Sequence, residues 1–147
     1  MSDSTLPART TRSSSDEKRR TALRFFEQVW NTRLDVTIDE VFHPSFCGHG
    51  EGAEVTGVGS YKEARNVMLT AFPDLRVTVE DTAADGDHVV LRWNARGTHA
   101  GPGFGLEPTQ RRVKFRGMTW LTFRDGQVVE GWDAWNQGAL FQSLRTP

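Results

Sequence analysis

The C-terminal part of the chain decides the fold, and its key stretch, residues 112–136, reads RVKFRGMTWLTFRDGQVVEGWDAWN. Large apolar side chains alternate with polar ones on both sides of Asp125-Gly126, a pair typical of tight hairpin turns. The same alternation marks two earlier segments, Leu75–Val79 and Val89–Ala95, and an Asp-Gly-Asp turn at residues 85–87 joins them. The pattern therefore predicts an antiparallel meander of strands.

The last strand of this meander, residues 128–136, places a carboxyl group among indole rings. Its side chains fall into two sets, with Val129, Asp133 and Trp135 on one face and Glu130, Trp132 and Asn136 on the other. A carboxyl group walled by aromatic rings is costly to ionise, so its pKa rises, which suits a general acid or base. The other interpretation is an edge strand whose tryptophans pack in the core while its acids stay in solvent.

Helical patterns precede the meander, and one short pattern follows it. A first helix is predicted to begin at Ser14 or Ser15, because Ser14 and Glu17 have capping-box spacing. Further helices are predicted over residues 35–42 and 60–72, the latter opened by Ser60 and Glu63, with a closing helical turn over 138–144. Residues 45–50 are predicted as a short strand or turn, and residues 50–59 as a glycine-rich loop.

Helices followed by an antiparallel meander indicate an α+β fold. In such a fold the N-terminal helices pack on one face of a curved antiparallel sheet. A curved sheet with helices across its mouth forms a cone, which encloses a small-molecule pocket. The sequence therefore predicts a single pocket-bearing domain over residues 16–147.

Composition limits the possible partners and compartments. The chain has 147 residues, a formal net charge of -1 and a single cysteine, Cys47. The balanced charge gives no reason to expect nucleic acid or an anionic membrane as partner. Without a disulfide, a membrane span or an apolar signal segment, the expected location is the cytoplasm. Residues 1–15, rich in Ser, Thr and Arg, are expected to be a mobile tail.

The other polar candidates narrow the chemistry to acids, bases and a pocket. The four histidines match no zinc-binding spacing, so no metal is expected. His49 and His99 lie where predicted elements meet glycine-rich loops, and each is either a pocket residue or a hydrogen-bonded structural histidine. Residues 101–105 lack the lysine and hydroxyl of a phosphate-binding loop, and there is no nucleophile elbow or dinucleotide fingerprint. What remains is carboxyl and imidazole chemistry without a cofactor.

Several segments together carry a family resemblance. They are RFFEQVWN (24–31), Phe46 with His49, AFPDLRVTV (71–79), GTHAG (97–101) with Pro108-Thr109, and FRDGQVVEGWDAW (123–135). Through them, residues 20–144 resemble the SnoaL-like polyketide cyclases, within the nuclear-transport-factor-2-like superfamily of cone-shaped α+β folds. The resemblance implies a cofactor-independent enzyme that closes a ring of a bulky aromatic or polyketide-like substrate by an intramolecular aldol condensation.

The resemblance also implies roles for particular residues. Asp133 matches the general acid/base on the final strand, and His49 matches a pocket position that holds or polarises the carbonyl oxygen. The residues expected to bind the substrate are Phe26, Trp30, Phe46, Trp93, His99, Thr119 and Trp135. Relatives are commonly dimers or tetramers with packed sheets, so a homodimer or homotetramer is expected.

The chain departs from the family pattern beside Asp133. Met118-Thr119-Trp120 stands where some cyclases place a second polar partner, and Asn136 stands where many carry a second acid. Glu130 and Arg92 are possible replacements. Two alternatives therefore stay open: a related hydrolase, hydratase or hydroxylase in which Asp133 activates water, for example to open an epoxide, and a non-catalytic small-molecule-binding module.

Overall fold

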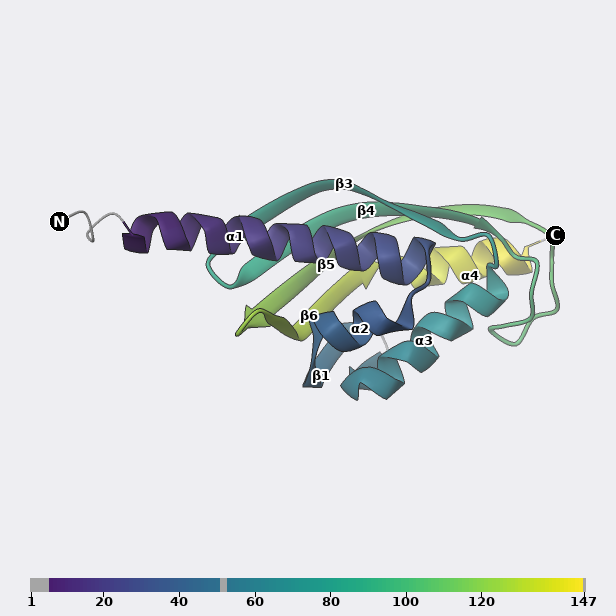
Figure 1. Ribbon diagram of the computed structural model, residues 1–147. Coiled ribbons are helices and arrows are strands. Elements are labelled where there is room, and N and C mark those ends of the chain that lie inside the picture. Colours follow the sequence, from purple (N-terminus) through teal and green to yellow (C-terminus); the bar gives the residue numbers. More distant parts are fainter. Residues whose placement is uncertain (1–5, 51–52, 147) are drawn as a thin grey trace.

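The computed structural model describes residues 6–50 and 53–146, which fold as helices packed against one sheet (Figure 1). The helices are α1 (Leu6–Phe25), the π-helix η2 (Phe26–Asn31), α2 (Asp35–Val41), α3 (Gly57–Ala71) and α4 (Gln137–Arg145). The strands are β1 (Phe42–Gly50), β2 (Ala53–Thr56), β3 (Arg76–Asp85), β4 (His88–Thr98), β5 (Arg112–Arg124) and β6 (Gln127–Trp135).

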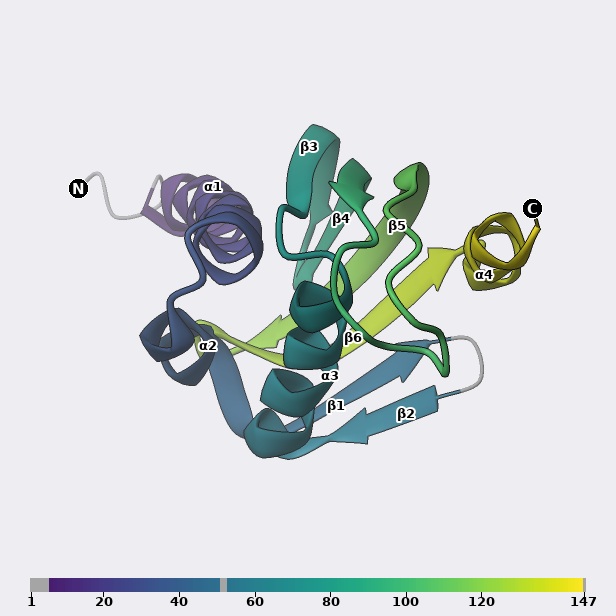
Figure 2. The same cartoon turned by 90° about the vertical axis from the view of Figure 1, so that its right-hand side faces the viewer.

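The six strands form one curved, open sheet in the order β2-β1-β6-β5-β4-β3. The predicted meander is present as β3 to β6, with antiparallel pairing throughout. One pairing is different, because β1 lies parallel to β6, with His49 opposite Trp132. Figure 2 shows the sheet curving around α3, with α1 and α2 on one side and α4 on the other. The expected fold class, an α+β cone, is confirmed.

The core fills the space between the helices and the inner face of the sheet. Strand β4 alternates buried and less buried residues along its length, as a strand covered on one face should. Its inward residues Val89, Leu91, Trp93 and Ala95 pack in one cluster with helix residues such as Val29. The π-helix is fastened to β3 by the Asn31 side-chain amide, which donates to the Val77 carbonyl and accepts from the Val77 N–H, both at 2.8 Å.

Two helices begin earlier than their capping patterns predict. Helix α1 begins at Leu6, so Ser14 and Glu17 lie inside it and do not mark its start. Pro7 falls in the first turn of this helix, where its missing N–H is tolerated. Residues 6–15 of the expected tail are therefore helical, and its residues 1–5 lie outside the described residues. Helix α3 begins at Gly57, whose positive φ of 85° makes the turn out of β2.

The segment between α2 and α3 has more strand than the sequence predicts. Strand β1 already begins at Phe42, and it contains Pro44. A proline is tolerated there because the pairing register between β1 and β6 is interrupted between Phe42 and Cys47. Part of the predicted loop over residues 50–59 forms β2, which pairs with β1 at the edge of the sheet.

Candidate active site

A cavity of about 220 Å³ lies between the helices and the inner face of the sheet. Its helical side includes Phe26, Trp30, Tyr61 and Met68, and its sheet side includes Phe46, Trp93, Phe115, Thr119, Asp133 and Trp135. The rings of Phe115 and Trp135 are stacked, with centroids 4.8 Å apart. These flat apolar walls suit a flat aromatic ligand.

Asp133 is the carboxyl group of this cavity, and the neighbouring strand holds it in place. The Thr119 hydroxyl donates to Asp133 Oδ1 at 2.5 Å, and Trp93 Nε1 donates to Thr119 Oγ1 at 2.9 Å. Protein surrounds Asp133, yet the residue keeps accessible surface because it borders the cavity. Burial raises the pKa of Asp133, and the hydrogen bond from Thr119 partly opposes this rise.

His49 borders the cavity on β1, but the hydrogen bonds of its ring go to residues other than Asp133. The imidazole ring stacks on Trp132, with centroids 4.0 Å apart. Its Nδ1 bonds to Glu54 Oε2 at 2.6 Å and its Nε2 to Glu130 Oε2 at 2.8 Å. Trp132 and Glu130 lie on the outer face of the sheet, opposite to Asp133. Hydrogen bonds to Glu130 and then Glu54 raise the pKa of His49 above its usual value.

His99 is also away from the cavity lining. Its side chain is fully buried, and Nδ1 accepts a hydrogen bond from the Thr109 backbone N–H at 3.2 Å. The ring packs against Phe72 with centroids 5.5 Å apart. The following loop is pressed so tightly on α3 that a Cβ on Gly101 would lie 1.9 Å from the Thr70 carbonyl oxygen. His99 therefore anchors this loop.

Six of the other residues expected in the pocket do line it, namely Phe26, Trp30, Phe46, Trp93, Thr119 and Trp135. Of these, Thr119 contacts the acid itself and so fills the place of a polar partner on the strand beside Asp133. Arg92 instead pairs with Glu80, with 3.1 Å between Nε and Oε1, and Glu130 pairs with His49. Neither of these two residues replaces a partner of Asp133.

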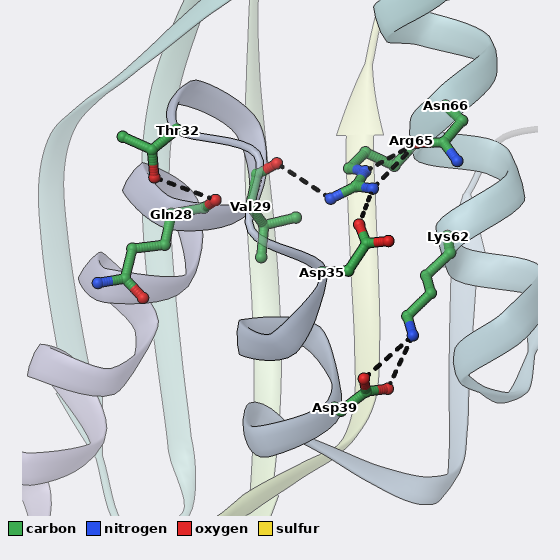
Figure 3. Close-up of polar contacts among 8 residues, drawn as sticks. All are labelled: Gln28, Val29, Thr32, Asp35, Asp39, Lys62, Arg65 and Asn66. Atoms are coloured by element: carbon green, nitrogen blue, oxygen red, sulfur yellow. Dashed lines mark hydrogen bonds and ion pairs between the residues drawn. The ribbon is translucent and has the colours of Figure 1, made fainter.

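Helix α3 contributes two polar pocket residues that the sequence analysis missed. The Tyr61 hydroxyl accepts a hydrogen bond from Trp30 Nε1 at 3.2 Å. Burial, and then the charge of Asp133, raise the pKa of Tyr61 well above its usual value. Arg65 is only 4% exposed and pairs with Asp35 while donating to the Val29 carbonyl at 3.4 Å (Figure 3). A tyrosine and an arginine four residues apart on an apolar helix face were the available signal.

The Arg65 contacts hold the helical side of the pocket together. Figure 3 shows its guanidinium reaching from α3 to Asp35 at the start of α2 and to Val29 in η2. One turn earlier on α3, Lys62 pairs with Asp39 at 2.9 Å between Nζ and Oδ1. Because η2, α2 and α3 meet at one buried cation, these contacts hold Trp30 on η2 and Tyr61 on α3 in place relative to each other.

Neither a membrane-spanning helix nor a cluster of metal ligands is present in the part of the chain that the structure describes. None of the helices in residues 6–50 and 53–146 combines the length and the apolar character needed to cross a membrane. Within the same residues, no three His, Cys, Asp or Glu side chains come together as a set of metal ligands.

A curved, unclosed sheet whose helices cover an aromatic pocket on its inner face is the architecture of the nuclear-transport-factor-2-like superfamily. Within it, the sequence model of the SnoaL-like polyketide cyclases matches residues 20–144, and the chain belongs to this family. No curated protein matches the sequence.

Solved structures of similar proteins agree with this assignment. A proposed SnoaL-like polyketide cyclase from Jannaschia sp. CCS1 is 26% identical, with a TM-score of 0.84 over 90% of this chain and 94% of that one. AclR from Streptomyces galilaeus, a proposed hydroxylase, is 32% identical, with a TM-score of 0.79 over 88% of this chain and 82% of its own. IdmH from Streptomyces antibioticus, a proposed polyketide cyclase, is 25% identical, with a TM-score of 0.76 over 88% of this chain and 99% of its own.

Proposed function

We propose that this protein closes a ring of a polyketide-like substrate by an intramolecular aldol condensation, with Asp133 as the general acid and base. The observation that carries the proposal is the environment of Asp133, a carboxyl group with a raised pKa, held by Thr119 on the wall of an aromatic cavity. A carboxyl group whose pKa is raised above its ordinary value by burial can take up and return a proton within one catalytic cycle.

The contacts of Asp133 leave one oxygen for chemistry. Oδ1 receives the Thr119 hydroxyl, so Oδ2 is the atom that removes a proton from carbon next to a substrate carbonyl. The resulting enolate carbon attacks a second carbonyl of the same molecule, and the new alkoxide takes the proton back from Asp133. Such a group contributes about 10²–10⁴-fold, and the cavity adds to this by holding the two reacting ends together.

Proton exchange tests the proposal without knowledge of the natural substrate. Anthrone is a flat tricyclic ketone whose acidic CH₂ lies across the central ring from the carbonyl and is conjugated with it through the two aromatic rings. It is incubated in D₂O, and exchange is followed by proton NMR. The wild-type protein is expected to accelerate exchange, and Asp133→Asn to lose at least about a hundredfold of that acceleration. The matched control is Glu63→Gln, an exposed carboxyl on α3. Equal exchange by Asp133→Asn and the wild type would remove Asp133 from the chemistry.

A second candidate reaction is activation of water by Asp133, for example to open an epoxide. It is favoured by the 32% identity to AclR, a proposed hydroxylase. Reaction in ¹⁸O-labelled water separates the two, because water activation places the label in the product skeleton, whereas an aldol closure forms a carbon–carbon bond. If the protein is a non-catalytic binding module, polycyclic ligands are expected to quench the fluorescence of Trp30, Trp93 or Trp135. In that case the protein does not accelerate anthrone exchange above the uncatalysed rate.

We also propose that a second copy of the chain covers the outer face of the sheet. Met118, Trp120 and Trp132 are each about half exposed, and Trp120 lies directly opposite Trp132 in the β5–β6 register. Arg116 and Glu130 lie at opposite ends of this apolar group along the strands. A two-fold axis running across the strands therefore brings Arg116 of one copy near the partner's Glu130.

The oligomeric state tests this arrangement. Trp132→Glu is expected to give a monomer in light scattering, whereas Val67→Glu, at an exposed apolar position on α3, leaves the assembly intact. The single variants Arg116→Glu and Glu130→Arg are both expected to weaken association, and combining them to restore it. A wild-type monomer at high concentration would contradict the proposal.

A further inference from the structure

The polar groups of the cavity differ in whether their hydrogen-bonding capacity is already used. Trp93 Nε1 donates to Thr119, and the Thr119 proton goes to Asp133. Trp30 Nε1 donates to the Tyr61 oxygen. The indole N–H groups of Trp30 and Trp93 and the threonine proton are therefore occupied within the protein, and they are not available to a ligand. The third indole of the lining, Trp135, lies on the sheet side together with Asp133.

The hydroxyl proton of Tyr61 remains available. The phenol oxygen already accepts the Trp30 N–H, and among the described residues the hydroxyl donates no hydrogen bond of its own. Tyr61 lies on the helical side of the cavity, while Asp133 lies on the sheet side. A ligand between α3 and β6 thus meets the Asp133 carboxylate on one side and the Tyr61 hydroxyl donor on the other.

His49, the residue expected to hold the substrate oxygen beside Asp133, does not fill this role. Both ring nitrogens of His49 are bonded to carboxylates on the outer face, so its imidazole cannot hold an oxygen inside the cavity. Arg65 uses its guanidinium for Asp35, Asn66 and the Val29 carbonyl. Tyr61 is therefore the donor on the helical wall best placed for a ligand oxygen.

We propose that Tyr61 is the second catalytic residue, and that it donates its hydroxyl hydrogen bond to the substrate carbonyl whose neighbouring carbon is deprotonated by Asp133. This inference rests on the proposed function, and it names the recognised group as a ketone oxygen directed towards α3. A substrate fits both residues at once when its ketone oxygen points to Tyr61 on the helical side of the cavity and its acidic hydrogen points to Asp133 on the sheet side.

The step balances within the substrate and the two residues. Asp133 Oδ2 takes the proton, and the electrons of the broken C–H bond move onto the carbonyl oxygen as an enolate. The Tyr61 hydroxyl keeps its proton and strengthens its hydrogen bond as negative charge grows on that oxygen. Carbon–carbon bond formation returns these electrons to carbon, and the proton on Asp133 passes to the new alkoxide.

The phenol suits this role because it stays neutral. Burial and the charge of Asp133 both disfavour ionisation of Tyr61, so the group remains a donor over the working pH range. The Trp30 N–H fixes the position of the phenol oxygen before substrate arrives. A donor fixed in advance at the place where charge develops is worth about 10²–10³-fold in rate.

Binding of fluorenone tests the inference apart from catalysis. This flat ketone has no hydrogen next to its carbonyl, so it binds without proton transfer. Its ¹³C-labelled carbonyl is expected to move downfield in the wild type and in Asp133→Asn, but not in Tyr61→Phe. Glu63→Gln, at an exposed position of α3 outside the cavity lining, is expected to keep the shift.

A second signal comes from the protein itself. Tyr61 is the only tyrosine of the chain, so labelling tyrosine Cζ with ¹³C gives one resonance. This resonance is expected to shift when fluorenone binds to the wild type, which tests the contact even if Tyr61→Phe folds poorly. Anthrone exchange by Tyr61→Phe is expected to fall by about 10²-fold.

The outcomes separate this inference from the proposed function. Loss of exchange in Asp133→Asn, together with an unchanged carbonyl shift and unchanged exchange in Tyr61→Phe, overturns the role of Tyr61 and leaves Asp133 as the base. Absence of accelerated exchange in the wild type overturns the proposed reaction, and the fluorenone signals still decide whether Tyr61 binds a ketone. A Tyr61 resonance that fluorenone does not shift overturns the inference.

Discussion

Thr119 and Asp133, opposite each other on β5 and β6, are joined by a hydrogen bond of 2.5 Å in which the threonine hydroxyl donates to the carboxylate. This bond does two things. It directs one carboxylate oxygen into the sheet and leaves the other for the cavity, and it opposes the effect of burial on the pKa of Asp133. The hydroxyl in turn accepts a hydrogen bond from the Trp93 indole N–H. A chain of two hydrogen bonds therefore links the buried Trp93 to Thr119 and Thr119 to Asp133.

Removing this hydroxyl is expected to move the pH dependence of proton exchange. Thr119→Val keeps the shape of the side chain but removes the bond that lowers the pKa of Asp133, so this pKa rises further. Exchange by a carboxylate base increases as the acid ionises, and the rising part of the anthrone pH profile is therefore expected at higher pH in the variant.

The same variant leaves the buried Trp93 N–H without its acceptor. This is expected to lower the free energy of unfolding by about 1–3 kcal/mol in urea titrations. Thr119→Ser keeps the hydroxyl and serves as the control for both measurements. A pH profile in Thr119→Val that coincides with that of the wild type would show that the bond does not tune Asp133.

Replacing the acid itself is expected to stabilise the fold at neutral pH. Because the pKa of Asp133 is raised in the folded protein, its contribution to stability is complete below the ordinary value of 3.8 and is lost as pH rises through the raised value. Asp133→Asn removes the buried charge and keeps an oxygen for Thr119. Urea unfolding at neutral pH should therefore show a more stable variant, with the difference shrinking in acid. A variant less stable than the wild type at neutral pH would contradict this account.

His49, on the outer face of the sheet, is expected to give a second pH dependence of stability, with the same sign as that of Asp133. Its pKa is raised by Glu130 first and Glu54 second, so this contribution is complete below the ordinary value of 6.5 and is lost as pH rises through the raised value. Unfolding experiments over mildly alkaline pH should show this loss in the wild type and not in His49→Gln. Glu130→Gln should reduce the loss more than Glu54→Gln, and the reverse order would contradict the assignment of causes.

The strand pattern of residues 112–136 was sufficient to predict the sheet, the hairpin and the placement of Asp133 and Trp135 on one face, because alternation along one strand is a local property. The pattern did not tell which of the two faces lies inward, and only the family resemblance implied it. The face of His49 was not predictable in this way. It follows from the parallel pairing of β1 with β6, which brings together residues about eighty positions apart and aligns His49 with Trp132 instead of Asp133. Local periodicity carries no information on such a pairing.

The helical wall was predictable only as an apolar stripe. Tyr61, Ala64 and Met68 have the spacing of a core-facing helix, and this spacing does not distinguish a hydroxyl that is used in the core from one that faces a cavity. The bond from Trp30 to Tyr61 depends on how η2 and α3 are joined through Arg65 and Asp35. The starts of α1 and α3 were misplaced for a related reason, because capping-box spacing also occurs inside helices.

Gly117 on β5 is expected to be essential for the shape of the cavity. A Cβ at this position would lie 2.4 Å from Trp93 Cζ2 and 2.9 Å from Trp135 Cβ, both of which line the cavity. Gly117→Ala must therefore displace Trp93 or the β6 backbone, which is expected to cost about 1–3 kcal/mol of unfolding free energy. The displacement also weakens the bond from Trp93 to Thr119, so fluorenone binding and anthrone exchange should fall together.

Gly59 offers a matched control for the same substitution. It lies in α3, and a Cβ added there meets nothing within 4 Å. Because alanine is the better helix former, Gly59→Ala is expected to raise the unfolding free energy by about 0.5–1 kcal/mol and to leave ligand binding and exchange unchanged. If Gly117→Ala bound fluorenone like the wild type and were equally stable, the close packing of Trp93 and Trp135 on this glycine would not set the width of the cavity.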